Sequence, residues 1–167
     1  MVNNEKKLLL EALQYEEGHK RRTQHILKVY SLVSLFCEYE DISEEEKIIL
    51  RAAAILHDIA IKYAKQHCNG DASQENQKKF APMLVEKFLL NANYNKSYIS
   101  KVIQLVLNHH NYYEEHFKSL QILIEADLII NCYESDYNQD RIQQIKTIFK
   151  TKIGKELLET YEKNNKI

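Results

Sequence analysis

The sequence LRAAAILHDIAIKY, residues 50–63, is the most apolar run of the chain, and the adjacent pair His57 and Asp58 interrupts it. Its apolar residues recur at three- and four-residue spacing, which is typical of a helix with one buried face. Upstream, Ser43 and Glu46 fit a capping box at the start of the same helix. This stretch therefore predicts a buried helix that carries two polar side chains into the core.

The same spacing continues on both sides of this stretch, and only 3 glycines and 1 proline interrupt 167 residues. The pattern predicts an all-α protein, a compact single-domain bundle of about six to eight helices. Pro82 predicts a kink or a split in its helix. No repeat or linker marks a boundary, so we expect one domain over residues 1–167, with a core over about 20–135 and C-terminal helices over 139–165. The predicted helices cover about residues 4–16, 20–39, 43–64, 74–90, 97–110, 120–134, 139–149 and 154–163.

Composition and charge exclude several classes of protein. The content of 44% hydrophobic and 28% charged residues is that of a globular chain rather than a disordered one. The chain has 23 basic and 24 acidic residues, so its net charge is close to zero. No overall positive potential would attract a nucleic-acid polymer or a membrane, and any phosphate recognition must be local. No segment approaches the roughly 20 apolar residues that cross a bilayer. The three cysteines form no CxxC pair, so we expect a cytoplasmic protein without a disulfide framework.

Polar side chains enter other apolar helical runs as well. His25 stands where the apolar stripe of RRTQHILKVY begins, and Asp127 interrupts LQILIEADLIINCY. His109 and His110 lie near the end of KVIQLVLNHHNYY. An unpartnered polar group in such surroundings costs about 1 to 3 kcal/mol, so these side chains need partners.

Imidazole and carboxylate groups together suit a divalent metal such as Zn, Fe, Mn, Co, Ni or Mg, rather than the soft ions that thiolates select. Adjacent helix residues lie about 100° apart, yet a longer histidine and a shorter aspartate can reach one ion over the side of the helix. Such a centre leaves coordination positions for water, as catalytic metal sites do. The ligands that we predict, from three helices, are His25, His57, Asp58 and Asp127.

The order of a histidine, a His-Asp pair and an aspartate on successive helices resembles the signature of the HD-domain phosphohydrolase superfamily. Residues 50–63 are similar to its central helix, IQLVLNHH to its following histidine helix, and LQILIEADLIIN to the segment with its last aspartate. FKTKIGKELLE is similar to a segment that follows the domain in many small bacterial members. The resemblance covers about residues 20–159 and implies a helical, metal-dependent hydrolase of phosphate esters, commonly nucleotides. It also implies that the same four residues bind the metal ion directly.

The resemblance also raises the question of a second metal ion. Members with two metals use further histidines, one on the helix after the His-Asp pair and others where this chain has His109 and His110. Here Gln74-Glu75-Asn76 stands about where the first of these histidines is expected. Glu75 could substitute as an oxygen ligand or lie on the surface at a helix start. We therefore expect one ion and leave the second open.

Several residues near the ligands are candidates to contact substrate. Arg21 and Arg22 precede the first ligand by about one helical turn and could clamp a phosphate. Lys62, four residues after the His-Asp pair, could neutralise charge on a substrate oxygen or form an i,i+4 ion pair with the aspartate. Asn131, one turn after the last ligand, could orient that ligand, bind substrate or be an amide at the edge of the core.

Proton transfer is assigned to Asp58 and the paired histidines. One of His109 and His110 is predicted to point into the site as a phosphate donor or proton shuttle, because a histidine pKa of about 6.5 lies near the working pH. Tyr112 and Tyr113 could stack on a base or serve in packing. The histidines expected on the surface are His19, His67 and His116.

The sequence thus predicts hydrolysis of a phosphate ester, a nucleotide or another small phosphomonoester, by metal-activated water. An alternative is a metal-containing module that senses or binds a nucleotide with little turnover. A third hypothesis is a structural helical protein in which His25, His57 and Asp127 satisfy one another as a polar network. The expected partner is a small phosphate ester, and a homodimer is possible.

Overall fold

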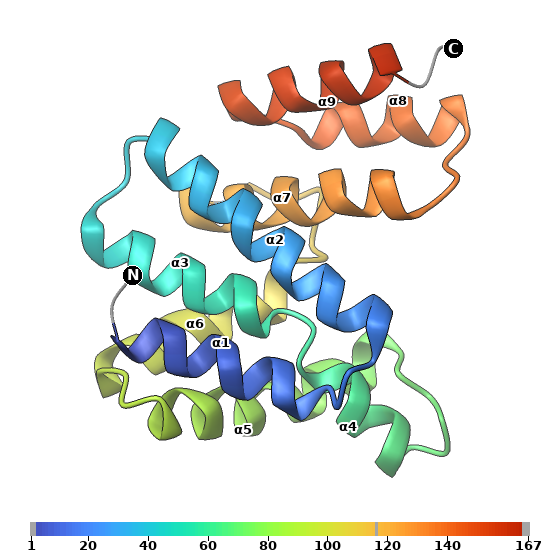
Figure 1. Ribbon diagram of the computed structural model, residues 1–167. Coiled ribbons are helices and arrows are strands. Elements are labelled where there is room, and N and C mark those ends of the chain that lie inside the picture. Colours follow the sequence, from blue (N-terminus) through green and yellow to red (C-terminus); the bar gives the residue numbers. More distant parts are fainter. Residues whose placement is uncertain (1–2, 116, 165–167) are drawn as a thin grey trace.

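Residues 3–115 and 117–164 are described by a computed structural model, and these residues form helices with no strand among them (Figure 1). The predicted all-α, single-domain fold is confirmed, while His116 lies outside the described residues. None of the described helices is both long enough and apolar enough to span a membrane. The helices are α1 (Asn3–Tyr15), α2 (Lys20–Tyr39), α3 (Glu44–Leu56), α4 (Ala60–His67), α5 (Gln74–Asn91), α6 (Lys96–Asn108), α7 (Lys118–Glu134), α8 (Gln139–Ile148) and α9 (Lys152–Asn164).

The helix predicted over 43–64 is divided into α3 and α4 by a turn at residues 57–59. Within this turn the Ile59 N–H donates to the Leu56 carbonyl at 3.0 Å, and the Ile61 N–H donates to the Asp58 carbonyl at 3.1 Å. Such three-residue hydrogen bonds wind the chain more tightly than an α-helix does. The His-Asp pair therefore lies on a local turn and not on the side of one continuous helix.

Other helix boundaries follow the signals in the sequence. The capping box is present, because the Ser43 hydroxyl accepts from the Glu46 N–H and the Glu46 carboxylate accepts from the Ser43 N–H. Helix α5 continues through Pro82, so the helix is not split there.

Helices α3 and α7 form the centre of the core. Seven residues of α3 are buried from Ile49 to Leu56, and α7 is buried on every side from Ser119 to Ile130. A helix that is apolar all round is buried all round, and α7 accordingly packs against α2, α3, α6, α8 and α9. Because α2, α3 and α7 also contact one another, polar side chains that point inward from these three helices meet.

The C-terminal helices, which stack above α7 in Figure 1, are held by a buried carboxylate. Glu125 of α7 is fully buried and accepts from the backbone N–H groups of Lys150 at 2.6 Å and Thr151 at 3.0 Å. Gly154 passes so close that a Cβ there would lie 2.0 Å from the Glu125 Oε2 atom. The segment from 149 to 159 thus anchors α8 and α9 and takes no part in the cluster of histidines and aspartates.

Candidate metal centre

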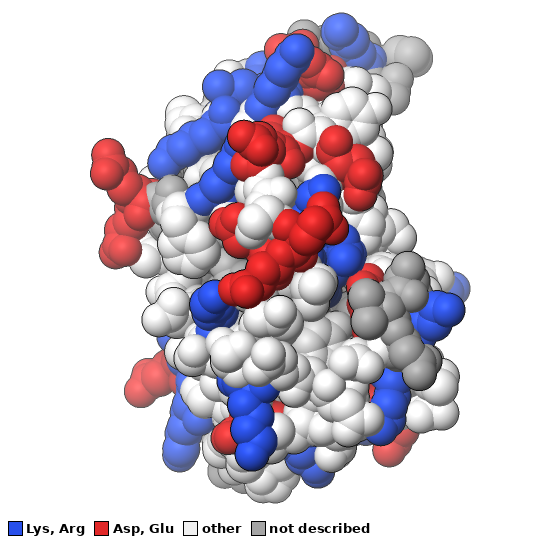
Figure 2. All heavy atoms as spheres, turned by 90° about the vertical axis from the view of Figure 1, so that its left-hand side faces the viewer, with Lys and Arg blue, Asp and Glu red and all other residues white. Residues whose placement is uncertain are grey.

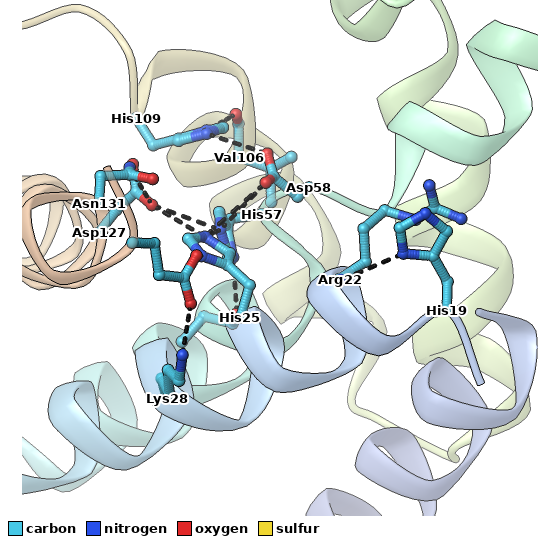
Figure 3. Close-up of polar contacts among 12 residues, drawn as sticks. His19, Arg22, His25, Lys28, His57, Asp58, Val106, His109, Asp127 and Asn131 are labelled. Carbon is cyan, nitrogen blue, oxygen red and sulfur yellow. Dashed lines mark hydrogen bonds and ion pairs between the residues drawn. The ribbon is translucent and has the colours of Figure 1, made fainter. Parts of the chain in front are cut away.

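The structure brings the four predicted ligands together (Figure 3). His25 comes from α2, His57 and Asp58 from the turn between α3 and α4, and Asp127 from α7. The His25 Nε2 atom lies 3.1 Å from His57 Nε2, 3.1 Å from Asp127 Oδ1 and 3.9 Å from Asp58 Oδ2. Ligand atoms of His25, His57 and Asp58 lie within 4.8 Å of one another, a separation at which one ion can contact all three.

Hydrogen bonds behind the rings fix which nitrogen faces the centre. The His25 Nδ1 atom lies 3.0 Å from the Glu134 carboxylate, and the His57 Nδ1 atom lies 2.8 Å from the Ala54 carbonyl. Each Nδ1 therefore donates outward, so each neutral ring directs the lone pair of Nε2 into the centre. Two such lone pairs 3.1 Å apart require a proton or a metal cation between them.

Two more polar atoms face the same centre without a partner. The Nδ1 atom of His109 donates to the Val106 carbonyl at 2.7 Å, which leaves its Nε2 atom directed inward, 3.7 Å from Asp58 Oδ1. This Nε2 atom and the Asp127 Oδ2 atom are buried and have no hydrogen-bond partner among the described residues. Buried polar atoms are rarely left unsatisfied. Together with the mixed nitrogen and oxygen donors, they show that these residues fit a divalent transition metal or Mg.

The electrostatics of the cluster favour a cation. Burial lowers the pKa of His25, but its hydrogen bond to Asp127 and the charges of Asp127 and Asp58 outweigh burial and raise that pKa to about 9. Burial would raise the pKa of Asp127, but the hydrogen bond from His25 holds it below its usual value, and the charge of His57 does the same for Asp58. With this raised pKa, His25 is protonated near neutral pH, and a metal ion that binds His25 must displace that proton.

Metal binding is consequently expected to depend on pH. An ion that binds here displaces the His25 proton, so its apparent affinity should rise about tenfold per pH unit from about pH 6.5 and level off near pH 9. Competition with a chromophoric chelator measures this slope for Mn or Co. The exposed His67→Ala variant serves as the control and should keep the slope, whereas an affinity that does not change over this range would contradict the prediction.

Glu134, the carboxylate that orients His25, was not among the residues predicted from the sequence. Its Oε2 atom accepts from His25, and its Oε1 atom accepts from the Lys28 ammonium at 2.7 Å. Burial would raise the pKa of Glu134, but these hydrogen bonds to Lys28 and His25 lower it. The available signal was its spacing along α7, because Asp127, Asn131 and Glu134 follow one another at four and three residues and share one helix face.

Replacing this carboxylate should weaken metal binding without touching a ligand. We expect Glu134→Ala to lower metal affinity about 10- to 100-fold, because the partners behind a ligating histidine fix its tautomer and orientation. Glu134→Gln keeps an acceptor for the His25 N–H and should lose less. Glu38→Ala, at the exposed end of α2, is the matched control. Equal affinities for Glu134→Ala and wild type would show that Glu134 does not position His25.

The predicted contact between Asn131 and the last ligand is present. The Asn131 Nδ2 atom donates to Asp127 Oδ1 at 3.0 Å, so the amide holds the carboxylate in place. Asn131 also lines the cavity beside the cluster.

A cavity of about 410 Å³, here called the inner cavity, opens beside His25 and Asp58. Its basic lining residues include Arg21, Arg22 and Lys65. The Arg22 guanidinium pairs with the buried Glu16 carboxylate and is thereby held in place. Arg21 and Lys65 are exposed and form no ion pair with the described residues. The cavity therefore offers positive charge next to the predicted metal ligands, as an anionic substrate requires.

Lys65 was not predicted, although it lies seven residues after Asp58 and one turn after Ile61, another residue of the inner cavity. Lys62, which was predicted, points elsewhere. Its ammonium donates to the Tyr15 carbonyl at 2.6 Å and lies 3.2 Å from the Glu17 carboxylate. The structure therefore does not bring Lys62 to the cluster, and the i,i+4 ion pair with Asp58 is not formed.

Both His109 and His110 lie at the cluster. Their ligand atoms and one oxygen of Asp58 lie within 4.8 Å of one another, which makes a second possible metal group that shares Asp58 with the first. Burial and then the charge of His109 lower the pKa of His110 to about 4. Glu75 is exposed and does not line the narrow pocket beside these histidines, where Gln74, Gln77 and Lys78 are found.

The remaining predictions concern residues at the edge of the site. His19 is exposed as expected, but it also caps α2, because its Nδ1 atom accepts from the Arg22 N–H, and it lines the inner cavity. His67 is exposed and stacks on Tyr63. Tyr112 is half-buried, with its ring centroid 6.1 Å from that of His110, and Tyr113 is exposed. The three cysteines are free.

Comparison with known proteins gives one match. A family model described as HD domain matches residues 22–132, which are more than half of the chain and include every predicted metal ligand. No curated protein and no solved structure gives a significant match.

Proposed function

The chain belongs to the HD domain family, and from this membership and the geometry of the cluster we propose that it hydrolyses a nucleotide or another small phosphomonoester. The family implies a metal-dependent phosphohydrolase. The observation that supports the proposal most is the convergence of His25, His57 and Asp58 beside a cavity lined by arginine and lysine.

The metal would be held by His25, His57, Asp58 and Asp127, whose nitrogen and oxygen donors suit Mn, Fe, Co, Ni, Zn or Mg. A bound ion of this kind lowers the pKa of a water molecule and polarises a phosphoryl oxygen. The protein contributes a preset arrangement of ligands, because the imidazoles of His25, His57 and His109 each have the other ring nitrogen hydrogen-bonded.

Substrate binding is assigned to the basic residues of the inner cavity. Arg22 is the best-oriented of them, since Glu16 fixes its guanidinium, and a planar guanidinium can donate two parallel hydrogen bonds to a phosphate. Arg21 and Lys65 are free to move onto the substrate. The Asn131 amide lines the same cavity and could donate to a phosphate oxygen after releasing Asp127.

Proton transfer falls to groups that border both the cluster and solvent. With its pKa lowered to about 4, His110 is neutral at physiological pH and carries a lone pair that can accept a proton. Asp58 stays ionised and orients the protons of groups near it. Once it has accepted a proton from water, the protonated His110 could pass that proton to the leaving alcohol oxygen and become neutral again.

The proposal is tested by phosphate release from nucleotides and simple phosphomonoesters with added Mn, Co, Ni, Zn or Mg. Release that requires metal and stops with a chelator would support the proposal and identify the substrate class. Nucleotide binding without release across the panel would instead support a sensing module. The cytoplasmic location and the homodimer stay predictions.

A further inference from the structure

A shallow hollow that is open to solvent, here called the outer cavity, adjoins the inner cavity along α2 and spans about 730 Å³. The two cavities share His19, Arg21 and Glu134 as lining residues. The outer cavity also reaches Lys20 and Gln24, which the inner cavity does not. A ligand held at the cluster could therefore extend along α2 without entering the core.

The spacing of residues on α2 explains why the cavities lie side by side. Lys20, Gln24 and Lys28 follow one another every four residues and share one face of the helix. Arg22 and His25 lie on the neighbouring face, which borders the inner cavity. Arg21 lines both cavities, so its side chain can contact a group in either one.

The outer cavity has more positive charges than its acidic residue can pair with. Its acidic residue, Glu134, already accepts from His25 and from Lys28. Lys20 and Arg21 are exposed and form no ion pair within the described part of the chain. The outer cavity thus keeps two cations without a partner among the described residues, and one of them, Lys20, does not line the inner cavity.

A dense run of acidic residues lies at the other end of α2. Residues 38–46, at the end of α2 and the start of α3, contain six acidic residues and no lysine or arginine. Figure 2 shows acidic side chains clustered on the face that carries this corner. Because α2 is about 30 Å long and charges are screened within about 8 Å, the acidic corner does not cancel the basic start of the helix.

We propose that the natural ligand carries two phosphate groups, of which the first binds in the inner cavity beside the cluster and the second binds in the outer cavity. Lys20 and Gln24 contact the second phosphate, and Arg21 bridges the two. This inference rests on the proposed function for the role of the first phosphate. It adds that a compound with one phosphate bound in the inner cavity leaves Lys20 of the outer cavity without an anionic partner.

The test is equilibrium binding of phosphonates that the protein cannot hydrolyse, measured by calorimetry on the metal-loaded protein. The probes are methylphosphonate, with one charged group, and methylenediphosphonate and propylene-1,3-diphosphonate, with two groups at short and longer spacing. We expect Gln24→Glu and Lys20→Ala each to lower the binding affinity of at least one diphosphonate about tenfold. Gln24→Glu adds a negative charge that repels the second phosphonate group, and Lys20→Ala removes a positive charge that attracts it. Methylphosphonate should change less than about twofold in both variants.

Gln104→Glu, which makes the same charge change at an exposed position of α6, is the matched control and should alter no affinity. The inference is overturned if Gln24→Glu leaves the affinities for both diphosphonates unchanged, or if it lowers the affinity for methylphosphonate by the same factor. An unchanged affinity would also follow if the outer cavity held a base stacked on the exposed Tyr133 ring.

Phosphate release, measured separately, distinguishes this result from failure of the proposed function. If wild type hydrolyses esters with one phosphate and Gln24→Glu does not change diphosphonate binding, the proposed hydrolase stands and the second phosphate site is disproved. If Gln24→Glu loses diphosphonate binding and wild type hydrolyses no ester, the two-phosphate ligand stands and the proposed hydrolase is disproved.

Discussion

Asp58→Ala is expected to lower metal-dependent phosphate release at least about 1000-fold, which corresponds to about 4 kcal/mol of lost transition-state stabilisation. Asp58 belongs to both groups of residues that could hold a metal, and it also lines the inner cavity. The variant therefore loses a metal ligand and a carboxylate beside the substrate in one change. The Asp58 side chain is 23% exposed, so its removal leaves no cavity in the apolar core.

Asp136→Ala, at an exposed position after α7, is the matched control and should keep full activity. Asp58→Asn tests the charge separately, because the amide keeps the shape of the side chain. Circular dichroism and denaturant unfolding should show that all three variants remain folded. If Asp58→Ala released phosphate at more than one tenth of the wild-type rate, the proposed role of Asp58 in the metal centre would be disproved.

The sequence was sufficient to predict most of the helices and which four polar side chains meet in the core, for a physical reason. Apolar spacing specifies which face of each helix is buried, and a polar residue within that face must point inward. His25 and Asp127 are such residues, and they meet because α2 and α7 pack against each other. The turn at 57–59 was not predictable in this way, since Ile55 and Ile59 keep the helical spacing across it.

The residues that sequence reasoning missed depend on contacts between distant segments. Lys62 was considered with Asp58, its neighbour on a helix, but its actual acceptor is the Tyr15 carbonyl, 47 positions earlier. The role of Glu134 likewise depends on His25, which lies 109 positions away. Spacing along α7 places Glu134 on the same helix face as Asp127, but it does not identify His25 as the partner, and only the packing of α1, α2, α4 and α7 reveals such contacts.

Removal of metal is expected to destabilise the protein strongly. At a free metal concentration 1000 times the Kd, binding to the folded state alone adds about 4 kcal/mol to the free energy of unfolding, against a total of about 5–15 kcal/mol for a typical domain. The buried Asp127 Oδ2 and His109 Nε2 atoms, which lack partners among the described residues, would each gain one. Thermal unfolding with and without a chelator at pH 8 measures the difference.

Asp127→Asn should lose this metal-dependent increment, because the amide is a much weaker ligand than the carboxylate, whereas His67→Ala should retain it. The choice of pH matters, since the raised pKa of His25, about 9, makes its proton compete with the metal increasingly as the pH falls. If chelation changed nothing in wild type, the His25 proton would suffice to hold His57 and Asp127 together. The cluster would then be a structural polar network, and the hydrolase proposal would lose its physical basis.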